Sequence, residues 1–150
     1  MRKAILGISA YYHDSAAAML VGGEVMAAAH EERFSRCKHD ARFPAHSVRY
    51  VLEETGVTPS DVECVAFYDK PFLKLERLLE TYHAFAPSGL QSFLQAIPLW
   101  IKEKVFMRDM LAKQLDSVGL AKTRVTFPEH HLSHAASAFY PSPFEEAAIL

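Results

Sequence analysis

The chain has 150 residues with a formal net charge of −2, and half of them are hydrophobic. This length allows a sizeable buried core without disulfides or a structural metal. The near-neutral charge argues against nucleic acid or an anionic membrane surface as the main partner. Cys37 and Cys64 lie far apart, which fits a reducing compartment better than a secreted disulfide scaffold, so we expect a cytoplasmic protein. The longest apolar run, Ala16 to Val21, is far too short to span a bilayer.

The first 56 residues predict an antiparallel meander followed by a helix. Three short apolar runs are joined by short connections: Ala4–Ser9, Ala16–Val21 and Glu24–Ala29. Between the last two, Gly22 and Gly23 supply the positive φ angles that a tight hairpin requires. After Pro44 the apolar residues fall at helical spacing, and Gly56 follows where a helix would end, which predicts a helix over Ala45–Thr55.

The rest of the chain alternates strands with helices. Strands are expected at Val62–Tyr68, Arg124–Phe127 and Ala147–Leu150. Helices are expected around Leu73–Tyr82, across Gly89–Val118 with a break at Pro98, and at Leu132–Tyr140. The order βββ-α-β-α-β-α-β predicts an α/β fold in which helices cover a mixed sheet. The section from about 72–119 is too long for a simple crossover, so we expect an inserted helical hairpin there.

His13 and Asp14 occupy the corner between the first two expected strands, where neither side chain can join an apolar face. In one interpretation Asp14 caps its own turn and His13 is a solvated loop residue. In the other, the corner faces a ligand, and His13 acts as a general acid or base because it titrates near neutral pH. The spacing does not decide between these two interpretations.

A charged segment, Glu31 to Asp40, follows the third expected strand. Alternating signs are typical of a solvated loop. The same segment brings together Arg33, Arg36 and Lys38, whose guanidinium and ammonium groups suit phosphate or carboxylate oxygens. Contact with a ligand and plain surface are equally compatible with this pattern.

Three histidines lie at the start of the last expected helix. If this helix begins near Pro128, His130 and His134 lie four residues apart on one face, where two imidazoles can reach one cation. His131 and His134, at i and i+3, form a second possible pair, so the helical register matters. The alternative is an alanine-rich packing helix whose histidines only cap it or form hydrogen bonds.

Taken together, the chain carries three motifs in a specific order: HDSAA, EERFxRxKHD and HHLxHAASAF. They lie within ISAYYHDSAAAMLVGGEVMAAAHEERFSRCKHDARFP and FPEHHLSHAASAFYPSPFEEAAIL. With this combination the chain resembles the amino-terminal part of the carbamoyltransferases of nodulation and of cephamycin or aminoglycoside antibiotic pathways. The resemblance implies an incomplete Kae1-like domain with the ribonuclease-H-like, or actin-like ATPase, fold. The middle of the chain fits the resemblance only loosely.

The resemblance also implies a reaction. In such enzymes a second, YrdC-like domain makes carbamoyl-adenylate from carbamoyl phosphate and ATP. The Kae1-like domain then transfers the carbamoyl group to a hydroxyl of a small molecule or sugar. Residues 1–150 leave no room for the YrdC-like domain, so we expect this chain alone not to catalyse transfer.

By motif, the resemblance implies that His130 and His134 are ligands of a divalent metal, with iron as the expected ion. It also implies that His13 and Asp14 lie in the first hairpin loop facing the adenylate. On this basis His13 is the candidate general base or acid of the transfer step.

The resemblance makes Arg33, Arg36 and Lys38 candidate contacts to the anionic part of the donor. One departure is His30, where the family pattern commonly has a further acidic residue before Glu31. The role of the acidic residues in this segment is therefore left open.

Two other functions use the same fold: a non-catalytic, truncated relative that acts as a binding or scaffold domain, and another ATPase. The second is disfavoured because kinase-like and chaperone-like ATPases carry a glycine- and threonine-rich phosphate loop in the first hairpin. This chain has His13 and Asp14 there instead.

Overall fold

The computed structural model describes residues 3–68, 79–86, 88–95, 98 and 107–148. The chain forms two compact units, one made of Met1–Asp69 and Gln114–Leu150 and the other of Lys70–Lys113. The helical insertion expected over about 72–119 overlaps the second unit, in which residues 79–85 and 90–95 are helical. Residues 107–117 of the same section also form a helix, whereas residues 72–78, 87, 96–97 and 99–106 lie outside the described residues.

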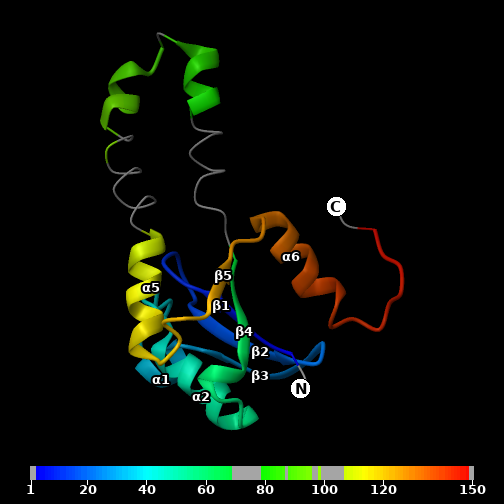
Figure 1. The fold of residues 1–150 in the computed structure, drawn as a ribbon. Helices are drawn as coiled ribbons and strands as arrows, with labels where there is room; N and C mark the ends of the chain where they lie inside the picture. Colours follow the sequence, from blue (N-terminus) through cyan, green and yellow to red (C-terminus); the bar gives the residue numbers. More distant parts are fainter. Residues whose placement is uncertain (1–2, 69–78, 87, 96–97, 99–106, 149–150) are drawn as a thin grey trace. The chain divides into compact units, whose positions relative to one another are not determined.

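A five-stranded mixed sheet forms the centre of the first unit (Figure 1). Its strands are β1 (Ala4–Ser9), β2 (Ala16–Val21), β3 (Glu24–His30), β4 (Val62–Phe67) and β5 (Arg124–Thr126). They lie in the order β3-β2-β1-β4-β5. Strands β1, β2 and β3 pair antiparallel, whereas β1, β4 and β5 pair parallel. This arrangement of a meander beside parallel strands confirms the ribonuclease-H-like, actin-like ATPase fold class.

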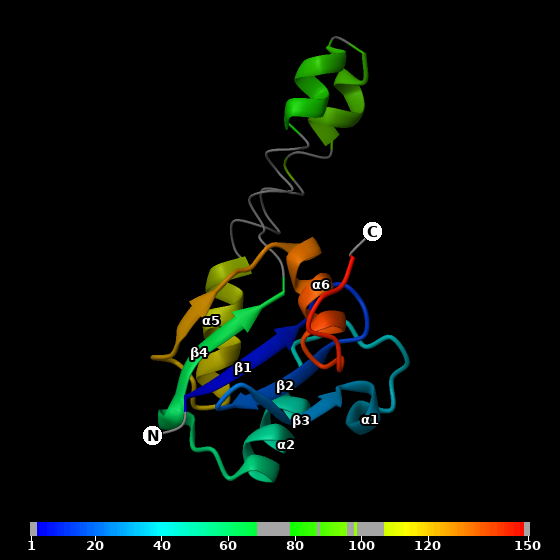
Figure 2. The same ribbon diagram turned by 90° about the vertical axis from the view of Figure 1, so that its right-hand side faces the viewer.

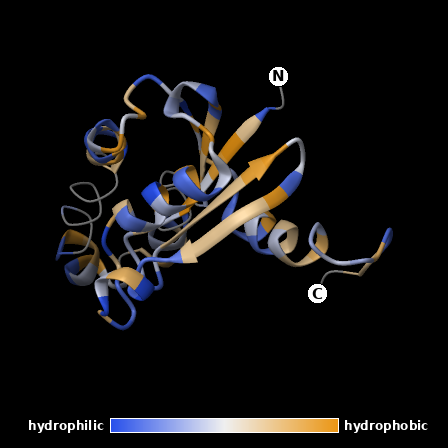
Figure 3. Ribbon diagram, turned by 90° about the horizontal axis from the view of Figure 1, so that it is seen from below, coloured by the Kyte–Doolittle hydropathy of each residue, from blue (hydrophilic) through white to orange (hydrophobic). Residues whose placement is uncertain are grey.

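The alternation of side chains along the strands explains the sheet. In β1, Ala4, Leu6 and Ile8 are buried, and in β2 the buried positions are Ala17 and Met19. The strands are coloured mainly in the apolar shades in Figure 3. Because alternate residues share a face, these positions place the core against one side of the sheet.

The turn between β2 and β3 depends on two glycines. Gly22 and Gly23 have φ angles of 66° and 94°, a region that side chains with a Cβ rarely adopt. The predicted tight hairpin is therefore confirmed.

Helix α2 (Ala45–Thr55) packs on β2 and β3 through Val48, Val51 and Leu52, and it ends at Gly56, whose φ is 66°. These bounds are the ones expected from the sequence. Helix α6 (His130–Phe139) has no buried residue, and it lies on the opposite side of the sheet from α2 (Figure 1).

The remaining described elements are short or lie late in the chain. They are α1 (Glu32–Ser35), the 3₁₀ turn η1 (Pro59–Asp61), α5 (Met107–Ser117) and α6 (His130–Phe139). No helix in these described ranges combines the length and apolarity of a membrane span.

The strand expected at Ala147–Leu150 is not formed at the two positions that the structure describes. Ala147 and Ala148 are not in a strand, and the other two residues of the run lie outside the described residues. A strand needs a neighbouring strand to satisfy its backbone N–H and C=O groups, and none of the described strands pairs with this run.

Candidate active site at the carboxyl ends of the parallel strands

Three parallel strands direct the candidate residues to one edge of the sheet. His13 and Asp14 follow β1, Tyr68 follows β4, and His130 follows β5. Figure 2 shows the arrowheads of β1 and β4 at the end of the sheet where α6 lies. In open α/β sheets, ligands bind outside the carboxyl ends of such strands. The fold therefore gathers at one edge residues that are more than 100 positions apart in sequence.

Aromatic side chains connect the two histidine groups along this edge. The ring centroids of Tyr11 and Phe67 lie 6.2 Å apart, and those of Phe67 and Tyr68 lie 5.2 Å apart. The Tyr68 ring in turn meets His130 edge to face, with centroids 5.6 Å apart. Burial raises the pKa of Tyr11 to about 12, so its phenol stays neutral at physiological pH and is no candidate base.

Asp14 lies between two imidazoles. Its Oδ2 lies 2.7 Å from Nδ1 of His13, and its Oδ1 lies 2.8 Å from Nδ1 of His39. Hydrogen bonds donated first by His39 and then by His13 lower the pKa of Asp14, so this carboxylate is ionised at neutral pH. The sequence predicts the His13–Asp14 pair but not the second imidazole.

Both imidazole rings of this group are open to solvent. The side chains of His13 and His39 are 58% and 62% exposed, and that of Asp14 is 36% exposed. With each Nδ1 bonded to the carboxylate, each Nε2 is the atom that remains to exchange a proton or contact a ligand. A carboxylate that orients an imidazole through Nδ1 is a recurring arrangement in general acid–base catalysis.

Backbone hydrogen bonds hold the two loops of this group together. The N–H groups of Tyr11 and Ser15 donate to the carbonyl oxygens of Ala41 and Asp40, at 2.8 and 2.9 Å. These bonds join the loop after β1 to the segment of residues 36–42. Such cross-links fix the positions of His13 and His39 relative to one another.

The same two loops contain every non-glycine residue with a positive φ among the described residues. They are Tyr11 (69°), Asp14 (52°), Arg36 (57°) and His39 (56°). Side chains with a Cβ adopt this conformation at a cost, and it persists only where surrounding contacts enforce it. Residues with a strained backbone are concentrated at functional sites. Their confinement to these two loops supports the loops as part of the candidate active site.

Glu31, whose role the sequence leaves open, has a structural role. Its carboxylate is buried and accepts hydrogen bonds from the backbone N–H groups of His46 and Ser47, at 3.2 and 2.9 Å. It also bonds Nδ1 of His46 at 2.6 Å and the Ser47 hydroxyl at 2.9 Å. Burial alone would raise the pKa of Glu31, but these bonds outweigh it and the pKa is lowered. Glu31 therefore caps the N-terminus of α2.

Asp40 and Arg42 form a second structural pair. Nε and Nη2 of Arg42 donate to the two carboxylate oxygens of Asp40, at 2.9 and 2.6 Å. These hydrogen bonds hold the pKa of Asp40 well below its usual range, although its burial opposes the shift. Asp40 is buried while Arg42 is largely exposed, so the pair anchors the loop that carries His39.

The three predicted anion contacts are exposed. Arg33 lies in α1, and Arg36 and Lys38 lie in the loop that carries His39. Among the residues that the structure describes, none of the three side chains has an ion-pair partner within 4 Å. They are therefore available to an anion, and Arg36 and Lys38 are the two that belong to the cross-linked loops.

His130 and His134 are brought together as the spacing predicts. Their Nε2 atoms lie 3.2 Å apart and their rings meet edge to face. Helix α6 starts at His130, so these two residues are one turn apart. The described residues contain no cluster of three or more His, Cys, Asp or Glu side chains able to hold a metal ion.

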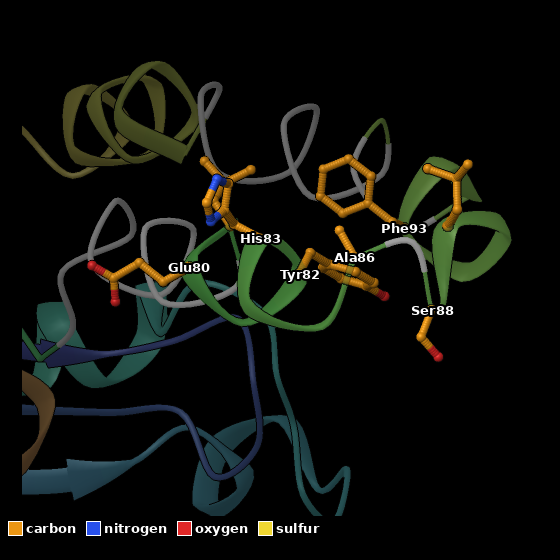
Figure 4. Close-up of a pocket in the computed structure, with 8 residues that line it drawn as sticks. Glu80, Tyr82, His83, Ala86, Ser88 and Phe93 are labelled. Carbon is orange, nitrogen blue, oxygen red and sulfur yellow. The ribbon is translucent and has the colours of Figure 1, made fainter.

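Side chains of both units line cavities among the described residues. One, of about 660 Å³, is lined by His131, His134 and the apolar rings of Phe139 and Phe144, among others. A cavity of about 680 Å³ in the second unit has a mostly apolar lining that includes Tyr82 and Phe93 (Figure 4). None of the residues singled out from the sequence lines this second cavity.

The model of the carbamoyltransferase N-terminus family matches residues 4–150, which is almost the whole chain. The chain belongs to this family. As a carbamoyltransferase N-terminal domain it is 40% identical over 143 residues to the nodulation protein NolNO of Sinorhizobium fredii, covering 93% of this chain and 19% of that protein. It is 54% identical over 150 residues to the uncharacterized protein sll1178 of Synechocystis sp., covering 97% of this chain and 24% of that protein.

The carbamoyltransferase N-terminal domain thus spans about a quarter or less of the length of these curated relatives. Among solved structures it is similar to YeaZ from Pseudomonas aeruginosa, with a TM-score of 0.43 and 15% identity over 85% of this chain and 44% of that one.

One member of the candidate site was missed from the sequence of this carbamoyltransferase domain. His39 lies within the EERFxRxKHD motif but has no spacing relation to Asp14, which is 25 residues away. The only sequence signal was the motif itself. The acidic residues left open by the sequence now have positions: Glu31 caps α2, and Glu32 accepts the N–H of His39 at 3.2 Å.

Proposed function

We propose that this chain is the amino-terminal part of an O-carbamoyltransferase. The reaction would transfer a carbamoyl group from carbamoyl-adenylate, made from carbamoyl phosphate and ATP, to a hydroxyl of a small molecule or sugar. Family membership supports the reaction class. The observation that carries the assignment of the site is the placement of two histidine groups, His13 with Asp14 and His130 with His134, at one edge of the sheet.

His13 is the proposed general base. Its Nδ1–H donates to Asp14, which leaves the lone pair of Nε2 to accept the proton of the acceptor hydroxyl. The hydroxyl oxygen then forms a bond to the carbamoyl carbon, and the bond from that carbon to the phosphate oxygen breaks with its electron pair on the phosphate. The ionised Asp14 stabilises the imidazolium that results.

The products of this step are the carbamoylated acceptor and AMP. Negative charge increases on the departing phosphate, so cations near it lower the barrier. Arg33, Arg36 and Lys38 are proposed to contact the phosphate because they are exposed and unpaired within the described part of the chain.

The histidine pair on α6 fits a divalent metal ion, with iron as the expected one. Two nitrogens bound to one ion at about 2.0–2.1 Å lie roughly 3 to 3.5 Å apart. The Nε2 atoms of His130 and His134 are separated by 3.2 Å. When bound, such an ion supplies Lewis-acid polarisation of the carbamoyl carbonyl. Two imidazoles leave coordination positions for water and for ligands from other parts of the protein.

The test uses the full-length protein that contains this chain. It is incubated with ATP, carbamoyl phosphate labelled with ¹⁴C in the carbamoyl carbon, and a small-molecule extract of the cells that produce it. The expected result is transfer of ¹⁴C to a compound that carries a hydroxyl. The label should be released by alkali, as expected of a carbamate ester, and should appear only when both ATP and carbamoyl phosphate are present. AMP release without any labelled compound, or binding of these ligands without turnover, would favour a non-catalytic domain.

A further inference from the structure

We propose that His39 contacts the phosphate of the donor and stabilises it as it departs. This inference rests on the proposed carbamoyl transfer, and it assigns different roles to the two imidazoles on Asp14. His13 accepts the hydroxyl proton at Nε2. His39 acts as an imidazolium, whose Nδ1–H donates to Asp14 and whose Nε2–H donates to the phosphate oxygen that receives the electron pair of the broken bond.

The positions of the two histidines favour this division. Nδ1 of each ring is bonded to a different oxygen of Asp14, so one carboxylate holds both rings. His13 belongs to the loop after β1. His39 belongs to the loop that also carries Arg36 and Lys38, whose exposed side chains form no ion pair among the described residues, unlike Arg42, which is paired with Asp40. The His39 ring therefore belongs to the same segment as the two cations available to bind an anion.

The surroundings of His39 show that its position is enforced. Its φ is 56°, its N–H donates to Glu32 Oε2 at 3.2 Å, and its ring is held by Asp14 at 2.8 Å. Its neighbour Asp40 is anchored by Arg42 and by the N–H of Ser15. Contacts on both sides thus maintain a strained backbone, and they leave Nε2 of the exposed ring open to a ligand.

A role in holding the loop is the competing explanation, and two substitutions separate it from phosphate contact. Asn at position 39 places its amide N–H near the position of Nδ1, so it can keep the bond to Asp14 but offers nothing at Nε2. Gln places its amide N–H near the position of Nε2, so it can keep a donor for the phosphate but lose the bond to Asp14. The two explanations predict opposite rankings.

The experiment measures binding of AMP and of adenosine to the full-length protein by calorimetry at neutral pH, and needs no turnover. We expect His39→Asn to weaken AMP binding about tenfold or more, and His39→Gln to weaken it less, as expected from the loss of one hydrogen bond to a charged group. Adenosine, which has no phosphate, should bind all variants equally. AMP binding at another site of the protein would appear as a second binding event in the calorimetric titration, with an affinity that neither substitution changes.

Transfer rates from preformed carbamoyl-adenylate should rank in the same order, with wild type fastest and His39→Asn slowest. His46→Asn is the matched control, because His46 also bonds a carboxylate through Nδ1 and is exposed to a similar extent but lies on α2. If His39→Asn binds AMP like wild type, or if His39→Gln is the weaker binder, the proposal is wrong. If AMP binding ranks as expected but neither wild type nor any variant transfers a carbamoyl group, the phosphate contact is supported and the proposed reaction is wrong.

Discussion

Two carboxylates in this domain bond histidines through Nδ1, and they differ in what surrounds them. Glu31 is 4% exposed and accepts four hydrogen bonds, two of them from backbone N–H groups of α2. Asp14 is 36% exposed, and its two carboxylate oxygens bond the rings of His13 and His39. The first carboxylate caps a helix, whereas the second holds two exposed rings in the candidate site.

The comparison shows that a carboxylate–imidazole contact is not by itself a functional signal. Buried carboxylates that satisfy backbone donors contribute to folding, because leaving those donors unpaired is costly. A half-exposed carboxylate whose partners keep a free ring nitrogen contributes little to folding and is suited to proton transfer. Burial and the identity of the hydrogen-bond donors therefore separate the two groups, and substitutions at each should have opposite effects.

The largest expected effect is at Asp14. Asp14→Asn removes the charge that orients both imidazoles and stabilises an imidazolium, so transfer by the full-length protein should fall about 10²- to 10⁴-fold. The midpoint of urea denaturation should stay near the wild-type value, because the side chain is partly exposed and makes no backbone bond in the described structure. A large loss of stability with transfer retained would reverse the roles of the two carboxylates.

The histidines of α6 extend the comparison to metal binding. His130→Ala and His134→Ala should each reduce the iron content of the full-length protein at least tenfold, because each removes a direct ligand. His131→Ala should leave the content nearly unchanged, because its ring is not in the 3.2 Å contact of Nε2 atoms. Metal analysis of the three purified variants provides the measurement. Equal loss in all three would contradict the pairing.

Glu31 should show the opposite behaviour from Asp14. Glu31→Gln keeps the shape but puts an amide among four donors, so we expect a loss of about 1–3 kcal/mol in the free energy of unfolding. Urea denaturation followed by circular dichroism measures this change. Transfer per folded molecule should remain near wild type, and a selective loss of transfer without loss of stability would place Glu31 in the active site.

A smaller effect is expected from Asp40 at low pH. Its pKa is lowered in the folded state, so the unfolded chain binds a proton that the folded chain does not as pH falls below about 4. The stabilisation from this pair is therefore fully present at neutral pH and is lost as pH falls from about 4 through the lowered pKa. Asp40→Asn should flatten the fall of stability in this acid range. An unchanged slope would show that the pair with Arg42 does not persist in solution.

Local sequence signals were enough to predict much of the sheet and α2. The bounds of β1, β2 and α2 match the expected residues because the signals are local: apolar alternation, Gly22-Gly23 at the turn, and Pro44 and Gly56 around the helix. Strand pairing across the sheet is not local. The expected strand at residues 147–150 therefore failed at its described positions, where an apolar run has no partner.

The sequence predicts contacts in the candidate site only between residues that lie in the same helix or the same loop. His130 and His134 are one helical turn apart, and His13 and Asp14 are adjacent, so both pairs follow from the sequence. The contact of Asp14 with His39 depends on backbone bonds that join two loops. The distinction between Glu31 as a helix cap and Asp14 as an orienting group depends on burial, which the charged pattern of the segment does not reveal.

The most direct test of the account is a single turnover measured with preformed carbamoyl-adenylate and an acceptor that the labelling experiment identifies. Wild type, His13→Gln and the control His46→Gln are compared in the full-length protein across a pH series, which separates transfer from donor synthesis. The account predicts a fall in transfer of about 10²- to 10⁴-fold for His13→Gln at every pH, and an unchanged rate for His46→Gln. A fall of less than about tenfold for His13→Gln would contradict the assignment of His13 as the general base.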